Sequence, residues 1–313
     1  MKKINITLND IFLEDEMFRI SYFLSLEKLI PSLKKVGLIS PPLVTIRGKR
    51  FILVSGWKRV LACLKISLSP LPVFVIEKEN NLNTFLMAFY ENLASREFSL
   101  LEKAEILSKL KKFGEDEKKI VRHYMPLLDI PSTLSHFDSF AAFSQFEPEV
   151  KKVIHEKNMP FPSVKLLAGF TPRERKSLLP LLAPLGQNKG KEILKDLKEI
   201  SKKNDVPPEK ILSSKEILDI LGAERTPPLQ KADKIRFLLR KKRYPTLSAW
   251  NDSFDSLLRN LEWPKEIMIK PSQFFEGENF SITFSFKNQE ELRASLLKLQ
   301  ELASREELSK IFK

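Results

Sequence analysis

Short apolar runs alternate with stretches of helical periodicity through residues 1–90. The runs at 51–54 and 71–76 have the length and composition of buried strands. The segment 29–37 has the spacing of an amphipathic helix that stops at its final glycine, and a further short strand is expected between that helix and the first apolar run. This alternation predicts a mixed α/β domain over residues 1–96.

The rest of the chain changes character twice. Helical periodicity runs through residues 97–203 with only short breaks, which predicts an all-α domain. Two proline pairs surround a short helix in residues 204–230 and predict a connector. Residues 231–313 begin with a helix and continue with two strands and a last helix, so a small ββα carboxy-terminal unit is expected. The predicted fold class is therefore α+β.

The clearest strand pattern lies in this last unit. Residues 280–286 place an apolar side chain at every second position and a hydroxyl between them, which predicts a strand with one buried face. Residues 267–270 are expected to pair with it. Four leucines at helical spacing are expected to cover the sheet: Leu292, Leu296, Leu299 and Leu302. Because two strands and one helix make a thin core, the unit should dock on the rest of the chain or pair with a second copy.

A glycine turn between the strand at 51–54 and the next helix carries the candidate phosphate chemistry. Gly56 frees the backbone to turn, and Lys58 and Arg59 place two cations on the first helical turn. Free N–H groups at a helix start favour anions. These residues alone leave two interpretations open, a phosphate-binding turn and an ordinary strand-to-helix turn. The sequence contains no Walker loop or dinucleotide-binding glycine pattern, and its histidines lack metal-ligand spacing.

Composition and charge narrow the class of partner. The 313 residues can form two or three domains, and 53 Lys and Arg against 40 Asp and Glu give a net charge of +13 that is spread along the chain. Such an excess favours a polyanion such as DNA, the alternative being a soluble protein that is merely rich in lysine. The single cysteine, Cys63, and the absence of any long apolar run predict a cytoplasmic protein without a membrane partner.

The order of these elements resembles the amino-terminal half of the ParB family of chromosome and plasmid partition proteins. In that family a Gly-Glu-Arg-Arg box starts a helix, and a Glu-Asn-x-x-Arg box follows the next strand. The first box is matched here by Gly56, Lys58 and Arg59, with Trp57 in place of its glutamate. The second box is matched by Glu91 and Asn92, with its arginine displaced by one position to Arg96 and Ser95 at the usual place. The similarity covers about the first 105 residues and continues more weakly to about residue 185.

The resemblance implies a ParB/sulfiredoxin-like first domain in which CTP with Mg²⁺ binds between the two boxes and closes a dimeric clamp on double-stranded DNA. The implied nucleotide-binding residues are Gly56, Lys58, Arg59, Glu91, Asn92 and Arg96. Because Trp57 and Ser95 depart from the boxes, at most a weak CTP hydrolase is expected, and no catalytic residue is assigned. A homodimer, a partition ATPase as partner and a nucleoid-associated location are also implied. Two alternatives stay open, a small-molecule kinase on the same fold and a protein-interaction adaptor without specific DNA recognition.

The family carries a helix-turn-helix in its helical middle, and the corresponding residues here allow one. A first helix is expected at 116–126, a turn at 127–130 and a recognition helix at 131–143 with Leu134, Phe137 and Phe140 or Phe143 packed inward. Candidate phosphate contacts on the first helix are Lys118, Lys119 and Arg122, and candidate base contacts on the second are Ser132, Thr133 and His136. Since the second helix lacks Arg and Lys, a purely structural helical bundle is the competing interpretation.

A second candidate DNA contact lies at 231–243. This segment has seven cations and one acid, and Ile235, Leu238 and Leu239 mark one helical face for burial. Its last four residues are expected to contact phosphates: Arg240, Lys241, Lys242 and Arg243.

Overall fold

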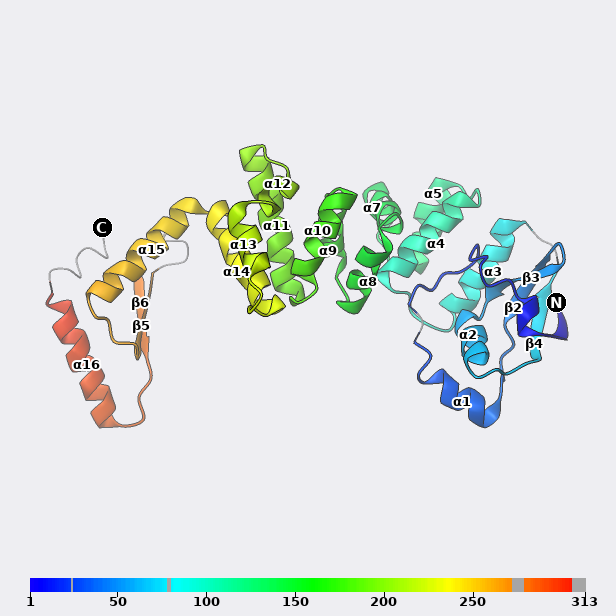
Figure 1. Ribbon diagram of the computed structural model, residues 1–313, viewed down its shortest axis with the longest axis horizontal. Coiled ribbons are helices and arrows are strands. Elements are labelled where there is room, and N and C mark those ends of the chain that lie inside the picture. The colour runs from blue at the N-terminus through cyan, green and yellow to red at the C-terminus, as the bar shows by residue number, and fades with distance from the viewer. Residues whose placement is uncertain (24, 78–79, 272–278, 306–313) are drawn as a thin grey trace. The chain divides into compact units, whose positions relative to one another are not determined.

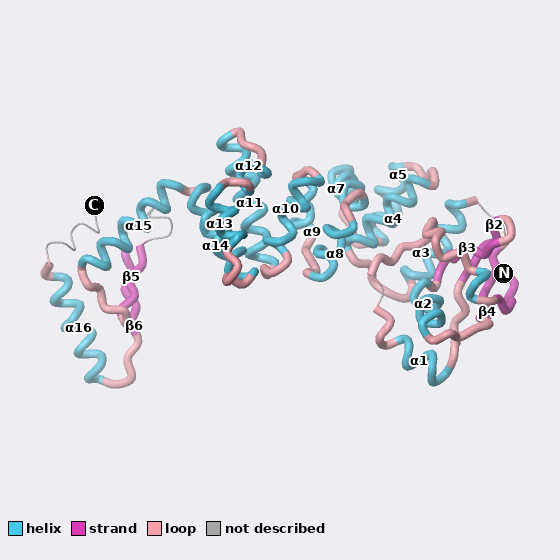
Figure 2. Tube along the Cα trace, viewed as in Figure 1, coloured by secondary structure: helices cyan, strands magenta, loops and turns pink. Residues whose placement is uncertain are grey.

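The computed structural model describes residues 1–23, 25–77, 80–271 and 279–305 (Figure 1). The chain divides into two compact units, Met1–Leu194 and Lys195–Lys313. Within the described ranges no helix has both the length and the apolar character needed to cross a membrane. The predicted order along the chain is confirmed: a mixed α/β part comes first, then a run of helices, then a small strand pair with a helix (Figure 2). The finer domain boundaries stay predictions.

A four-stranded mixed sheet opens the first unit. Its strands are β1 (Lys2–Ile6), β2 (Leu43–Arg47), β3 (Arg50–Ser55) and β4 (Leu71–Ile76). They lie in the order β1-β4-β2-β3, with β2 parallel to β4 and the other two pairs antiparallel. Val44, Leu53 and Val73 are fully buried in the core of the sheet domain, and the last two belong to the predicted apolar runs.

Three helices pack around this sheet (Figure 1). They are α1 (Leu29–Val36), α2 (Trp57–Lys65) and α3 (Asn81–Leu93), and a short 3₁₀ turn, η1 (Leu8–Asp10), precedes them. Gly37, with a φ of 71°, ends α1 as the sequence predicted. Asn80 caps α3 by accepting a hydrogen bond from the backbone N–H of Asn83. These boundaries place the start of α2 and the end of α3 where the two sequence boxes lie.

Helices make up the remainder of the first unit. They are α4 (Leu100–Lys112), α5 (Glu117–Lys119), the π-helical segment η2 (Ile120–Tyr124), α6 (Met125–Leu127), α7 (Leu134–Ser144), α8 (Pro148–Glu156), α9 (Phe161–Ala168) and α10 (Pro172–Leu182). A further helix, α11 (Gln187–Asn204), runs into the second unit. A capping box between Ser99 and Glu102 fixes the start of α4, because each side chain accepts from the other's backbone N–H.

The second unit contains helices and one hairpin. Its helices are α12 (Pro208–Leu212), α13 (Lys215–Gly222), α14 (Pro228–Arg243), α15 (Pro245–Asn260) and α16 (Gln289–Ala303), and its strands are β5 (Ile267–Pro271) and β6 (Phe280–Phe284). The strands pair antiparallel, as predicted, although β6 ends two residues before Phe286.

The helix that covers this hairpin differs from the prediction. Phe254 and Leu261, from α15 and its end, pack with Ile269 of β5 and with Phe280. On α16, by contrast, Leu296 is 51% exposed, and only Leu302 of the four predicted leucines is buried. The helix that packs on the hairpin is therefore α15.

Candidate functional site

The turn before α2 strongly favours glycine at position 56. Gly56 has a φ of 96°, and a Cβ placed on it would lie 2.8 Å from Cβ of Pro42 and 3.1 Å from Nε of Arg59. Both the left-handed backbone and the close approach of Pro42 therefore make a side chain at this position unfavourable. As a result α2 starts immediately beside the end of β3, and the backbone of the turn lies open to the space next to it.

A pocket of about 390 Å³ lies beside this turn. Its lining comes from the loop before α1, the segment after α1, the β3–α2 turn and the end of α3. The structure brings together all six residues predicted to bind nucleotide, since the lining includes Gly56, Lys58, Arg59, Glu91, Asn92 and Arg96. Two sequence boxes that are more than thirty residues apart thus meet around one cavity.

Arg59 and Glu91 join the two boxes directly. The guanidinium of Arg59 lies 2.8 Å from Oε1 of Glu91, and its other arm donates to the hydroxyl of Ser40 at 2.7 Å and to its carbonyl at 3.0 Å. The second carboxylate oxygen of Glu91 accepts from the hydroxyl of Ser55. Each of these side chains is held by at least two partners, so both are fixed in place before any ligand arrives.

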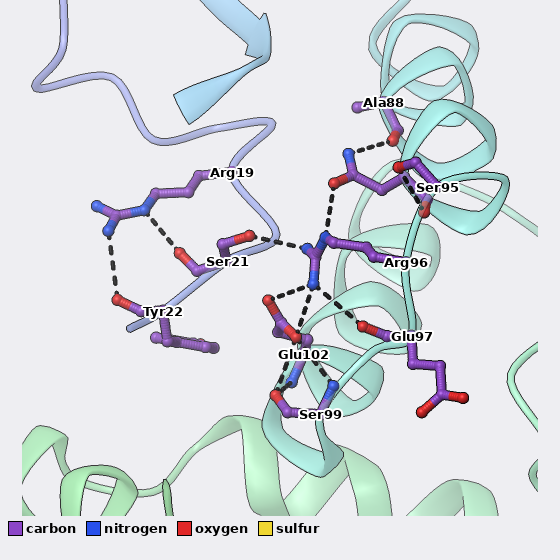
Figure 3. A network of polar contacts seen from close by, with 10 residues as sticks. Arg19, Ser21, Tyr22, Ala88, Ser95, Arg96, Glu97, Ser99 and Glu102 are labelled. Carbon is purple, nitrogen blue, oxygen red and sulfur yellow. Dashed lines mark hydrogen bonds and ion pairs between the residues drawn. The ribbon is translucent and has the colours of Figure 1, made fainter. Parts of the chain in front are cut away.

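Arg96 lies at the centre of a second network, between the loop before α1 and the start of α4 (Figure 3). It donates to Oδ1 of Asn92 at 2.9 Å, to the hydroxyl of Ser21 at 2.8 Å and to the carboxylate of Glu102 at 3.1 Å. Burial opposes the charge of Glu102, but hydrogen bonds from Arg96 and Ser99 outweigh it and hold the pKa of that carboxyl below its usual value. The displaced arginine of the second box is therefore neutralised by an acid.

Lys58 and Trp57 differ from these two arginines. Lys58 is exposed at the pocket and forms no ion pair with any described residue. Trp57 is only 6% exposed, and its buried Nε1–H has no hydrogen-bond partner within the described structure. The guanidinium of Arg19 lies over its ring, 4.9 Å from the centroid. Lys58 is thus the cation of the pocket that is available to an anion without breaking a pair.

The loop residues 18–23 contribute contacts that the sequence did not reveal. Ser21 accepts from Arg96 at the pocket, while Tyr22 next to it donates to Glu105 of α4 and accepts from Lys151 of α8 at 3.0 Å. Burial first, and the neighbouring carboxylate of Glu105 second, raise the pKa of Tyr22 well above its usual value. Ser21 and Tyr22 lie among the apolar residues Phe18, Ile20 and Phe23, and the sequence carries no signal that links them to their distant partners.

Comparison with known proteins points to one family. No protein-family model matches the chain. A probable chromosome-partitioning protein ParB of Borreliella burgdorferi is 24% identical over 174 residues, which cover 55% of this chain and 64% of that protein, less than two thirds of its length. The chain is a distant homologue of ParB.

Solved ParB structures give further matches. A C-terminally truncated ParB of Caulobacter crescentus complexed with CTP-γ-S is 18% identical, with a TM-score of 0.27 over 57% of this chain and 99% of that one. The truncated protein complexed to the centromeric parS site is 15% identical, with a TM-score of 0.34 over 62% and 99%. A Pnob8-like ParB-N domain is 14% identical, with a TM-score of 0.41 over 63% and 96%. Because these TM-scores are low, the description of the fold is based on the helices and strands of this chain alone.

The segment expected to form the recognition helix of a ParB helix-turn-helix is helical but shifted. The helix α7 begins at Leu134, because Thr133 accepts from the backbone N–H of His136 and caps it, so that the predicted start at residue 131 is wrong. Leu134 was expected to pack inward but is 59% exposed. Phe137, Phe140 and Phe143 are buried, as predicted.

The candidate DNA-contacting residues of this region are mostly exposed. Ser132 and Thr133 lie at the surface before α7, while His136 contacts the Thr133 hydroxyl at 2.7 Å and stacks on Phe161. On the preceding helix Lys118 and Arg122 are exposed, and Lys119 is paired with Glu115 at 3.0 Å. Their role in DNA binding stays a prediction.

The basic end of α14 is largely neutralised within the second unit. Lys241 pairs with Asp252 and Lys242 with Glu216, each at 2.5 Å, and Arg243 pairs with Asp196 at 2.6 Å. Arg240 is exposed and forms no ion pair with a described residue. Ile235 and Leu239 are buried on the face that the sequence predicted.

Proposed function

We propose that this ParB-like protein acts on DNA in chromosome or plasmid partition, or in a related DNA-maintenance role, and that CTP binds in the pocket beside Gly56. The observation that carries the proposal is the convergence of both sequence boxes on one cavity of about 390 Å³. The ParB of Caulobacter crescentus was solved with CTP-γ-S and with parS DNA, which supports the choice of both ligands.

The chemistry of the pocket suits the phosphates of a nucleotide. Backbone N–H groups at the start of α2 favour negative charge, and beside them Lys58 adds a cation that has no ion pair among the described residues. Arg59 and Arg96 also line the pocket but remain paired with Glu91 and Glu102. In this arrangement Lys58 provides the main electrostatic attraction, and the two arginines shape the site.

DNA binding and self-association extend the proposal beyond the pocket. The net charge of +13 favours a duplex, and the exposed Lys118 and Arg122 give phosphate contacts a place in the helical part of the first unit. In the second unit Ile282 and Leu296 are about half exposed, which supports pairing with a second copy as a homodimer. A partition ATPase as partner and a nucleoid-associated place in the cytoplasm complete the proposed role.

Titration calorimetry with CTP, ATP and GTP tests the nucleotide assignment. Lys58→Ala should lower CTP affinity by about tenfold, because it removes a charge-assisted contact to a phosphate. Lys65→Ala is the matched control, since Lys65 is an exposed lysine on the same helix that does not line the pocket. Equal affinities of the two variants, or no heat from wild type with any nucleotide, would overturn the proposal.

A protein-interaction adaptor is the second candidate, and the ion pairs of α14 favour it. Of the four cations at the end of α14 that were expected to contact DNA, three already have carboxylate partners. An adaptor would show no binding to duplex DNA even at low salt, whereas the partition role requires binding that weakens steeply as salt rises.

A further inference from the structure

Magnesium is the metal that the family resemblance attaches to the nucleotide, and the residues of this pocket do not fit it. Mg²⁺ needs oxygen ligands in near-octahedral geometry, usually one or two carboxylates together with phosphates and waters. Among the described residues that line the pocket, one carboxylate is present, that of Glu91. In the described part of the chain, no group of three or more His, Cys, Asp and Glu residues is placed to hold a metal ion.

Both oxygens of this carboxylate are already engaged. Oε1 lies 2.8 Å from the guanidinium of Arg59, and Oε2 accepts from the hydroxyl of Ser55. The side chain of Arg59 is only 19% exposed and is also held by Ser40. Moving Glu91 onto a metal would therefore break both its ion pair with Arg59 and its hydrogen bond from Ser55.

The second position at which the family has a carboxylate is closed to a metal. Trp57 stands in place of the box glutamate, and its indole N–H is a donor without a lone pair to give. The ring is packed in the core of the sheet domain, with Arg19 over one face at 4.9 Å. A cation next to this ring would also meet the positive charge of Arg19.

We infer that this pocket binds its nucleotide without a divalent metal. The inference rests on the proposed function and deepens it by stating which form of the ligand is taken. Lys58 and the N–H groups at the start of α2 supply the neutralisation that a metal would otherwise give, so the ligand is a free nucleotide anion. Metal-assisted hydrolysis then has no place at this site.

The first test compares CTP binding by wild-type protein in excess MgCl₂ and in EDTA, measured by titration calorimetry. We expect the two affinities to agree within about twofold. A decrease of about tenfold or more in EDTA would overturn the inference while leaving the proposed nucleotide binding intact. Absence of binding in both buffers would instead overturn the proposed function together with the inference.

The second test uses a substitution for which the two hypotheses predict opposite signs. Glu91→Gln keeps the shape of the side chain but removes a negative charge and frees Arg59 for the phosphates. Metal-free binding should tighten by about two- to fivefold, the size of a partly exposed ion pair. A metal-ligand role for Glu91 predicts weaker binding, and equal or weaker affinity would refute the inference.

Glu97→Gln is the matched control for this substitution. Glu97 is an exposed glutamate close to Glu91 in sequence, and its side chain does not line the pocket. The Glu97→Gln substitution removes the same charge at nearly the same place in the chain, so any general electrostatic effect of removing a carboxylate appears in both variants. Thermal unfolding followed by circular dichroism establishes that both variants are folded before their affinities are compared.

Discussion

Replacing Gly56 with alanine should strongly destabilise the first unit, because the added Cβ both strains the backbone and overlaps a neighbouring residue. The φ of 96° places the residue in a backbone region that costs an L-residue about 1–2 kcal/mol. The added Cβ would also lie 2.8 Å from Cβ of Pro42, whose ring is part of the chain entering β2 and cannot rotate away. Relieving that overlap should cost a further 1–3 kcal/mol or so.

Gly48→Ala separates these two costs. Gly48 has a φ of 62° in the turn between β2 and β3, but a Cβ there meets no atom within 4 Å. Its substitution should therefore show the backbone cost alone, about 1–2 kcal/mol. The difference between the two variants measures the close approach of Pro42 to the turn.

Tryptophan fluorescence during urea unfolding gives the measurement. Trp57 is the one tryptophan in residues 1–194, so replacing Trp250 and Trp263 with phenylalanine leaves a reporter of the first unit. We expect Gly56→Ala to lower the free energy of unfolding by about 2–5 kcal/mol. If Gly56→Ala lowers the free energy of unfolding no more than Gly48→Ala does, then Pro42 does not pack closely against the turn. The shape derived for the pocket would then also be incorrect.

Two further predictions concern charge. The pKa of Glu102 is lowered in the folded protein, so the stabilisation that its charged form gives is present above the usual pKa of 4.5 and is lost as the pH falls below it. Glu102→Gln should therefore make the free energy of unfolding, measured by urea titration, decrease less at acid pH. An unchanged decrease at acid pH would contradict the pairing of Glu102 with Arg96. For DNA, neutralising Lys118 and Arg122 should reduce the slope of log affinity against log salt by about 0.9 for each DNA phosphate that the variant no longer neutralises. Neutralising Lys241 and Lys242 should change that slope less, because both are ion-paired, and the reverse order in a fluorescence anisotropy titration would move the DNA-binding surface to α14.

The pocket could be predicted because its residues lie at the ends of regular elements. Gly56 follows a strand, and Glu91 lies in the last turn of a helix, so periodicity and the family boxes located both. The sequence could not show that Arg59 and Glu91 would pair with each other, since this depends on how α2 and α3 are placed in space. It also missed Ser21, because its partner Arg96 is 75 residues away in the sequence.

Two incorrect predictions, the start of α7 and the helix that covers the hairpin, concern places where two sequence signals compete. Pro131 is acceptable in a first helical turn, but the side chain of Thr133 satisfies a backbone N–H of α7, and this cap decided where the helix starts. In the last unit, α15 and α16 both carry apolar residues at helical spacing. Alternation in β6 predicts a buried face but does not say which helix buries it, and packing against Phe254 selected α15.

The charges around the pocket indicate that nucleotide and DNA bind to different cations of the protein. Among the residues that the structure describes, three cations line it; Arg59 and Arg96 are matched by Glu91 and Glu102, which leaves Lys58 as the unpaired charge there. The excess of +13 therefore lies almost entirely on other surfaces, where it is available to a duplex. Because the pocket and those surfaces draw on different residues, Lys58→Ala should weaken nucleotide binding while the salt dependence of DNA binding is preserved. A parallel decrease of both in calorimetry and anisotropy would mean that the two ligands share one site.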